Sequence, residues 1–381
     1  MYVSLYLYDT QQAMKKKKII IGVSAGCIIV FLITIFGNIS FAAKAADSLL
    51  RPVIGEKNTL LLESWYFKVQ DKADALHYTV VGAKTPAFSS PIEANQQPTS
   101  NSDQMDLDHI ASILSKPLPG EGVWIPIPQP LYPKQIIVAR TFIRPDMQRP
   151  YATVSLVKMD MKKLGIGTEA GTYYPGGTHK VYGPGFVPKT IQDTNRLMAV
   201  FNGGFQERDG HYGMIVGHTI YVPLRQNLAT LVMDTNGSVQ LVDYTGQPFS
   251  PDVLSVRQNG PFLVRDGKIA PFVEQGLDTW GRTTTNSMYT WRSGLGITKE
   301  GNLIYAVGNA LVPETLAKAL LAAGAVNALQ LDINPFWVRF ILYQTKGNGQ
   351  YTYYPLLSSM KNGGYQYLHR YNKDFFYVYK K

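Results

Sequence analysis

The feature that most restricts the fold of this chain is a series of glycine turns between short strand-type segments. Asn236-Gly237, Asp266-Gly267 and Glu300-Gly301 each separate two runs rich in Val, Ile, Leu or Phe. Turns of this kind join adjacent strands of a hairpin, because glycine readily adopts the positive φ that they require. The sequence therefore predicts that the chain from about residue 136 onward consists mostly of antiparallel β hairpins.

One segment departs from the hairpin pattern. Residues 302–307 (NLIYAV) and 326–332 (VNALQLD) have the composition of buried strands, and 313–323 (PETLAKALLAA) has that of a helix. Pro313 suits the first turn of this helix and Gly324 its end. Strand, helix and strand with short connections predict a right-handed βαβ crossover whose two strands are parallel neighbours. The predicted fold class is α+β, with antiparallel hairpins and one crossover unit.

The first 45 residues have the pattern of an export signal or a membrane anchor helix. Lys15 to Lys18 precede an uncharged apolar run at 19–37, and Ala43-Lys44-Ala45 fits cleavage by signal peptidase before Ala46. The lysines stay in the cytoplasm in either case. We therefore expect the main domain outside the cell membrane, either anchored to it or secreted after cleavage near Ala45-Ala46.

The remainder divides into two predicted regions. Residues 46–135 form an N-terminal extension and residues 136–381 form the main domain. Within the extension, 82–104 is rich in Pro, Ser, Gln and Asn, which is typical of a linker. Residues 106–116 predict a short helix, whereas 47–81 mix helical and strand patterns and favour neither.

Charge and cysteine content exclude several classes of function. The net charge is +10, but residues 1–45 hold five Lys against one Asp, which leaves 32 basic and 26 acidic residues elsewhere. That excess of six has no dense basic run, so nucleic acid is not an expected partner. Cys27, the only cysteine, lies in the apolar run and excludes a disulfide within the chain, a thiolate metal site or a cysteine nucleophile. His211 and His218 make only a weak metal site, so no cofactor is predicted and a divalent metal is left open.

Four short motifs follow one another in the main domain. They are Phe201-Asn202-Gly203-Gly204-Phe205, Asn259-Gly260-Pro261 with the turn at Asp266-Gly267, Arg292-Ser293-Gly294-Leu295-Gly296, and Leu331-Asp332. In their order and spacing, over about residues 150–345, they resemble the phosphodiester glycosidase family. The resemblance implies an exported hydrolase that cleaves a sugar-1-phosphodiester bond in the cell envelope, with a phosphorylated glycan or glycosyl phosphodiester as its partner.

The chemistry of such a reaction assigns a role to each motif. A carboxylate is needed near the sugar C1 to support an oxocarbenium-like centre or to position water, and Asp332 is the candidate. Arg292 is the candidate phosphate clamp, because its guanidinium presents a fork of donors. The candidate substrate-binding residues are Asn202, Gly203, Gly204, Asn259 and Gly260. We predict that Asn202, Asn259, Arg292 and Asp332 line one pocket.

Structural interpretations of the same residues stay open. The two Asn-Gly motifs fit tight turns, Arg292 fits a strand surface, and Asp332 fits a strand end that orders a loop. Glu207 is the next carboxylate to consider as a catalytic group.

The last motif departs from the family pattern. The family has Leu-Asp-Gly-Gly-Gly-Ser, whereas this chain continues from Asp332 with Ile333-Asn334-Pro335-Phe336-Trp337. Phe336 and Trp337 form either a platform for a sugar or part of the core. Two alternatives to an enzyme remain: a non-catalytic envelope protein that binds phosphorylated glycan, and a structural surface protein.

Overall fold

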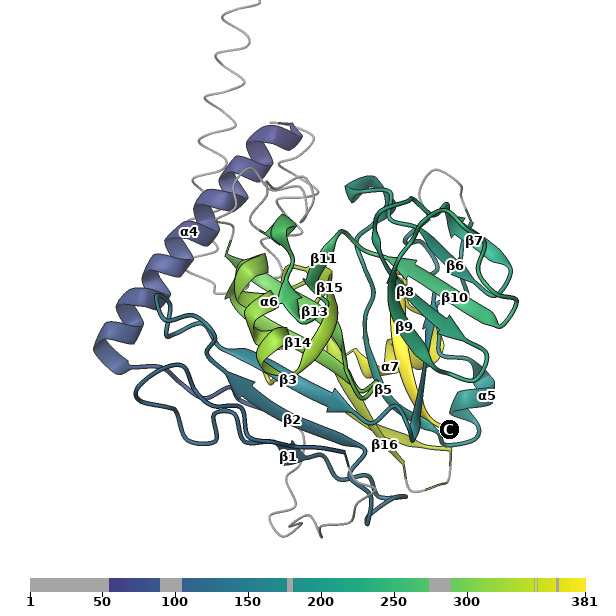
Figure 1. Cartoon of the computed structure of the whole chain (residues 1–381), viewed down its shortest axis with the longest axis horizontal. Helices are drawn as coiled ribbons and strands as arrows, with labels where there is room; N and C mark the ends of the chain where they lie inside the picture. The colour runs from purple at the N-terminus through teal and green to yellow at the C-terminus, as the bar shows by residue number, and fades with distance from the viewer. Residues whose placement is uncertain are drawn as a thin grey trace, which may run out of the picture.

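The computed structural model describes residues 55–89, 105–176, 181–273, 289–345, 347, 349–360 and 363–381. In this part of the chain, three mostly antiparallel β-sheets dominate and helices are few (Figure 1). The predicted anchor at 19–37 and most of the predicted linker lie outside the described residues. No helix within the described ranges combines the length and the apolar character needed to cross a bilayer.

Strands outnumber helices in the described ranges of the chain. In chain order the helices and strands are α4 (Glu56–Val81), β1 (Ile125–Pro126), β2 (Val138–Ile143), β3 (Val154–Met159), β4 (Leu164–Glu169), α5 (Lys189–Gln192), β5 (Leu197–Asn202), β6 (Met214–Val216), β7 (Thr219–Val222), β8 (Ala229–Asp234), β9 (Val239–Asp243), β10 (Val253–Gln258), β11 (Phe262–Arg265), β12 (Lys268–Ile269), β13 (Thr290–Thr298), β14 (Leu303–Leu311), α6 (Pro313–Ala322), β15 (Ala325–Ile333), β16 (Phe340–Thr345), β17 (Tyr351–Pro355), α7 (Gly364–His369) and β18 (Phe375–Lys380). Short 3-10 turns occur at Glu207–Asp209 and Pro271–Val273.

The three glycine turns join antiparallel strands, as predicted. Asn236-Gly237 connects β8 to β9, Asp266-Gly267 connects β11 to β12, and Glu300-Gly301 connects β13 to β14. The glycines have φ of 77°, 72° and 83° in this order, a left-handed conformation that side chains oppose. The local turn chemistry therefore decides these hairpins.

The largest sheet contains the predicted crossover unit with one correction. Its strand order is β1-β2-β3-β14-β13-β15-β11-β12. β14 and β15 are both antiparallel to β13, so they run parallel to each other and α6 connects them. They are not neighbours, because β13 lies between them. A side chain at Gly294 of β13 would approach Leu316 and Leu320 of α6 to 3.2 and 3.0 Å, so the glycine lets the helix pack over this central strand.

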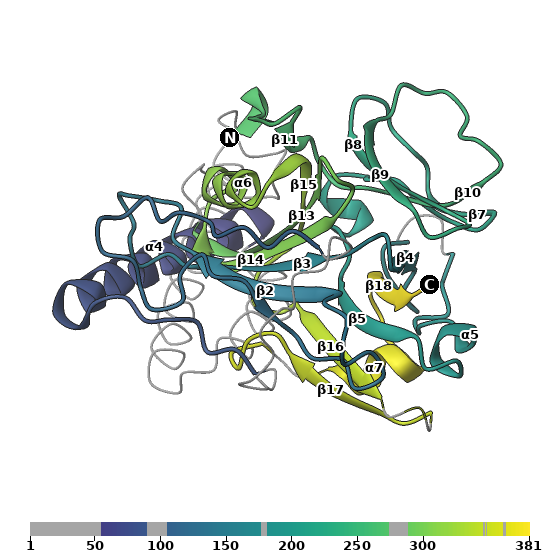
Figure 2. The ribbon, with the colours of Figure 1, turned by 60° about the horizontal axis from the view of Figure 1, so that its bottom comes forward.

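Two five-stranded sheets complete the described fold. The second sheet has the order β7-β6-β10-β8-β9, and the third has the order β17-β16-β5-β18-β4. Figure 2 shows the second sheet at the upper right, the third below it, and the large sheet to the left. Phe201 of β5 stacks on Phe340 and Phe376, and Tyr305 of the large sheet packs against it at 5.1 Å between ring centroids. This aromatic core joins the third sheet to the large one.

The N-terminal extension differs from its sequence pattern in two places. Residues 56–81 form the long helix α4, which the sequence does not predict, and Asp71 ties it to the body through an ion pair with Arg149. Residues 106–116 form no helix, so that prediction is wrong. The Ile110 N–H pairs instead with the Gly122 carbonyl at 3.0 Å, a long-range contact that local propensity does not contain. The division of the chain at residue 135 stays a prediction.

Candidate functional site

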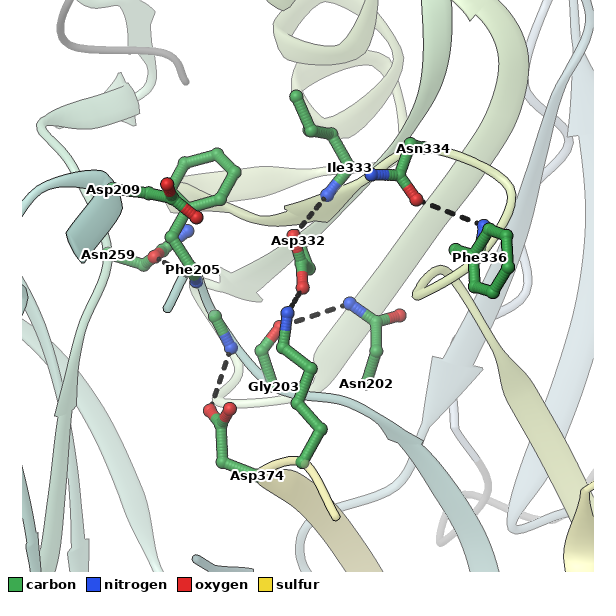
Figure 3. Close-up of polar contacts among 12 residues, drawn as sticks. Asn202, Gly203, Phe205, Asp209, Asn259, Asp332, Ile333, Asn334, Phe336 and Asp374 are labelled. Carbon is green, nitrogen blue, oxygen red and sulfur yellow. Dashed lines mark hydrogen bonds and ion pairs between the residues drawn. The ribbon is translucent and has the colours of Figure 1, made fainter. Parts of the chain in front are cut away.

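Strand ends from all three sheets converge on one buried cluster (Figure 3). Asn202 ends β5, Asn259 follows β10, Asp332 lies near the end of β15, and Asp374 directly precedes β18. Only 3% of Asp332 and 1% of Asp374 is exposed. Carboxylates this deeply buried are stable in ionised form only when they are paired or hydrogen-bonded.

Asn202 acts as a clamp between the sheets. Its Nδ2 donates to Ser293 Oγ at 3.0 Å and to the Gly203 carbonyl at 3.1 Å. Its Oδ1 accepts from Tyr305 Oη at 2.9 Å and from the Arg339 N–H at 3.1 Å. Both donors and both lone pairs of the amide are therefore in use. These hydrogen bonds fix the position of the loop that follows Asn202.

Asn259 fastens the same loop from the other side. Its Oδ1 accepts from the Phe205 N–H at 2.8 Å, and its Nδ2 donates to the Gln330 carbonyl at 2.7 Å. A side chain at Gly204 would lie 2.7 Å from Asn259 Oδ1, and one at Gly203 would run into the Asp374 carboxylate. The two glycines of this loop are required because these polar groups pack directly on the backbone. Gly260 has φ of 73° and its carbonyl accepts from the Ala229 N–H.

Arg257 and Asp374 form a buried ion pair beneath this loop. Arg257 Nε donates to Asp374 Oδ2 at 3.0 Å, and the Gly204 N–H donates to the same oxygen at 3.0 Å. The other guanidinium nitrogens of Arg257 reach the carbonyls of Phe205 at 2.8 Å and Gln258 at 2.7 Å. Asp374 Oδ1 has no hydrogen-bond partner among the described residues. The pair therefore leaves one buried acceptor open inside the cluster.

Asp332 pairs with Lys373 at the centre of the cluster. Asp332 Oδ2 forms an ion pair with Lys373 Nζ, while Oδ1 accepts from the Ile333 N–H at 2.8 Å (Figure 3). Burial lowers the pKa of Lys373 to about 7, against the opposing effect of the Asp374 and Asp209 carboxylates. An amine with a pKa near neutrality can give up or accept a proton under physiological conditions.

The turn after Asp332 covers this pair. Asn334 has φ of 69° and accepts from the Phe336 N–H at 3.0 Å through its side chain. Asn334 thus takes the left-handed conformation that glycine usually supplies, which accounts for a turn without the family's glycines. The turn brings the Trp337 ring to 4.5 Å from Lys373 Nζ. Phe336 and Trp337 are only partly buried.

Arg292 is placed differently from the other predicted site residues. Its Nε donates to the Leu311 carbonyl at 2.8 Å and its Nη1 to Gln330 Oε1 at 2.9 Å. Arg292 and Gly294 lie on the face of β13 that α6 covers, whereas Ser293 points to Asn202. Burial lowers the pKa of Arg292 to about 9. These contacts tie the end of β14 to β15.

Three residues of the cluster, Arg257, Lys373 and Asp374, were not predicted from the sequence. Lys373-Asp374 stands directly before the strongly apolar strand FFYVY, and Arg257 interrupts the apolar run of β10 just ahead of Asn259. Charges at such positions are rarely buried without a partner. That pattern is a signal for a buried ionic cluster, although it does not name the partners.

Comparison with known protein families bears on the predicted resemblance. Residues 195–332 match the phosphodiester glycosidase family. This confirms the predicted family resemblance for the span that holds Asn202, Asn259, Arg292 and Asp332. Lys373 and Asp374 lie beyond the span matched to the phosphodiester glycosidases. No curated protein matches the chain.

Solved structures similar to this chain include a phosphodiester glycosidase. The zebrafish N-acetylglucosamine-1-phosphodiester α-N-acetylglucosaminidase catalytic domain, auto-inhibited by its pro-peptide, is 15% identical with a TM-score of 0.40. The similarity covers 64% of this chain and 84% of that one. A hypothetical protein from Synechocystis is 12% identical with a TM-score of 0.35, over 65% of this chain and 63% of the other.

Glu207, His211 and His218 are the remaining titratable residues considered from the sequence. Glu207 is buried, and its Oε1 is 3.9 Å from His211 Nδ1. His218 is exposed. Within the ranges that the structure describes, no three His, Cys, Asp or Glu residues are grouped to hold a metal ion.

Proposed function

We propose that this protein is an exported hydrolase that cleaves a sugar-1-phosphodiester bond, with Asp332 as its essential carboxylate. The observation that carries the proposal is the buried ion pair between Lys373 and Asp332, the last residue of the span that matches the family. A carboxylate and a cation side by side match the two needs of the reaction, which are support at the sugar C1 and binding of the phosphate.

The proposed reaction breaks the bond between C1 and the phosphodiester oxygen. Water supplies the oxygen that joins C1, and the phosphate leaves as a phosphomonoester that keeps the bonding electron pair. Asp332 supports the positive charge that develops at C1 or accepts the proton of the attacking water. The phosphate is a good leaving group, so little acid assistance is needed.

Lys373 takes the phosphate-binding role in this proposal. It is the cation in contact with Asp332, whereas Arg292 donates to Leu311 and Gln330 on the face covered by α6. Substrate binding would move the ammonium from Asp332 toward the phosphate oxygens and free the carboxylate for the reaction. A pKa of about 7 also allows Lys373 to pass a proton to the departing phosphate.

The proposed location is the cell envelope. The basic start and apolar run of the first 45 residues support export, with the main domain either anchored or released after Ala45. Protease added to intact cells should digest the main domain of an exported protein, and an N-terminus at Ala46 would identify the released form.

The decisive test is turnover by the purified full-length chain. It should release a phosphomonoester from at least one member of a panel of sugar-1-phosphodiesters, and Asp332→Asn should remove most of that release while the protein remains folded. Unchanged turnover in a folded Asp332→Asn variant would remove Asp332 from the mechanism, and Glu207→Gln would be the next variant to measure.

A non-catalytic glycan-binding protein is the second candidate. The near-complete burial of Asp332 and Lys373 beneath Trp337 favours it, because a substrate reaches the pair only if this turn moves. Binding of a sugar-1-phosphodiester without any product release, measured by calorimetry and by phosphate analysis, would support this candidate over the enzyme.

A further inference from the structure

Four aromatic side chains form a continuous row between the surface and the Asp332–Lys373 pair. The rings of Tyr182 and Tyr173 are stacked with centroids 6.3 Å apart and planes inclined by 22°. Tyr173 meets Tyr174 edge-on at 4.7 Å, and Tyr174 meets Trp337 edge-on at 6.0 Å. We call Tyr182, Tyr173, Tyr174 and Trp337 the aromatic track.

The two ends of the aromatic track lie in different surroundings. At the outer end, 57% of Tyr173 and 53% of Tyr182 is exposed, which is unusual for large aromatic residues packed against each other. At the inner end, the Trp337 ring lies 4.5 Å from Lys373 Nζ, which pairs with Asp332. A ligand lying along the track would therefore extend from solvent at one end to Trp337, which covers the candidate catalytic pair, at the other.

The chemistry of these rings suits a sugar chain. The face of an aromatic ring carries partial negative charge, and the face of a pyranose presents C–H groups with partial positive charge. Tyr and Trp also have polar groups at their rims that can hydrogen-bond sugar hydroxyls. Because the row continues over several rings 4.7 to 6.3 Å apart, it offers contact beyond a single sugar.

We propose that the aromatic track binds the glycan chain of a polymeric substrate and leads one of its phosphodiester-linked sugars to Asp332. This inference rests on the proposed function and deepens it, because it makes the substrate a polymer rather than a small sugar phosphodiester. The continuity of the track with the ion pair favours this ligand. It commits the surface to a glycan.

The test compares a double variant, Tyr173→Ala/Tyr182→Ala, with Tyr365→Ala as its matched control. Tyr365 lies on α7, is 59% exposed and stacks on His369, so its replacement removes a similar exposed ring elsewhere. The full-length chain is run in native gels that contain dextran, laminarin, glycol chitin, mannan or wall teichoic acid. We expect at least one polymer to retard the wild-type chain and Tyr365→Ala, and to bind the double variant at least about fivefold more weakly.

The proposal fails if none of the polymers retards the wild-type chain. It also fails if the wild type, the double variant and Tyr365→Ala are retarded equally. Loss of retardation in Tyr365→Ala as well would also overturn it, because any exposed ring would then suffice. Turnover of small sugar-1-phosphodiesters separates this inference from the proposed function, since the double variant should retain wild-type turnover. If no small substrate is cleaved but a polymer is bound through the track, the proposed hydrolysis fails while the glycan site stands.

Discussion

Two buried ionic sites of this protein, the Glu121–Arg144 pair and the cluster around Asp332–Lys373, differ in how completely their atoms are hydrogen-bonded. Arg144 Nε and Nη2 donate to Glu121 Oε2 at 3.0 and 2.7 Å, and Nη2 also reaches the Lys116 carbonyl. Glu121 accepts further bonds from the Leu118 N–H at 2.8 Å and from Ser112 Oγ at 3.2 Å. This pair joins two loops, and both carboxylate oxygens of Glu121 accept hydrogen bonds.

The Asp332–Lys373 pair lies in a cluster that contains an unused hydrogen-bond acceptor. Asp374 Oδ1, next to it in the chain, has no hydrogen-bond partner among the described residues, and burial lowers the pKa of Lys373 to about 7. A buried pair with all its partners is typical of a structural role, whereas open acceptors and shifted pKa values are typical of a functional site. Burial alone therefore does not separate the two roles.

The largest expected effect is on turnover. Asp332→Asn should lower turnover by about 10²–10⁴-fold, because it removes the carboxylate that acts at C1. Its melting temperature should change little, because the amide still fills the site and Lys373 can lose its proton. Steady-state kinetics and a thermal melt on the same preparation check this. A variant that unfolds instead would make the Asp332–Lys373 pair structural, like Glu121–Arg144.

The matched variant in the structural pair should behave in the opposite way. Glu121→Gln leaves Arg144 buried without its carboxylate and should lower the free energy of unfolding by about 3–5 kcal/mol. Turnover per folded molecule should stay at the wild-type value. Urea unfolding followed by circular dichroism measures the first quantity, and active-site titration with kinetics measures the second. A large loss of turnover here would erase the distinction between the two pairs.

Phosphate binding should separate Lys373 from Arg292. Lys373→Met should weaken binding of a sugar-1-phosphodiester by about 1.5–3 kcal/mol relative to the free sugar, because it removes a charge-assisted contact. Arg292→Met should destabilise the fold, but it should change the binding of the sugar-1-phosphodiester and of the free sugar by the same factor. Calorimetric titration of both ligands into both variants tests this. A phosphate-selective loss in Arg292→Met alone would restore Arg292 as the clamp.

A further expected effect is a difference in the pH dependence of stability. The pKa of Lys373 falls from 10.5 to about 7 on folding, so the unfolded chain binds more protons between these values. The free energy of unfolding should therefore rise with pH from about 7 toward 10.5, by up to about 1.4 kcal/mol per unit, relative to Asp332→Asn/Lys373→Met. Identical slopes in the two proteins between pH 7 and 9 would contradict the shifted pKa.

The structural pair should respond at acid pH instead. Burial raises the pKa of Glu121, but hydrogen bonds from Arg144 and Leu118 outweigh it and hold the pKa below 4.5. Its stabilisation is present above that value and is lost as the pH falls through the folded pKa. Urea unfolding of the wild type and Glu121→Gln should therefore converge in stability at acid pH, and a constant difference down to pH 3 would oppose this assignment.

The sequence alone determined the features that depend on neighbours in the chain. Gly237, Gly267 and Gly301 specify their hairpins because the turn conformation needs positive φ within a few residues. The α6 boundaries follow from Pro313 and Gly324 for a similar local reason. The family resemblance was also accessible, since its motifs are short and keep their order.

Only the tertiary structure decided which side chains meet. Lys373 lies 41 residues after Asp332, and Arg257 lies 117 residues before Asp374, so no local pattern pairs them. The position of β13 between β14 and β15 likewise depends on how α6 packs over Gly294. The sequence indicated Asn202 and Asn259 as substrate-binding residues. In the structure their side chains hydrogen-bond to the loop at residues 203–205 and fix its position. Burial and charge pairing are long-range constraints, and they become visible only when strands from three sheets end at one point.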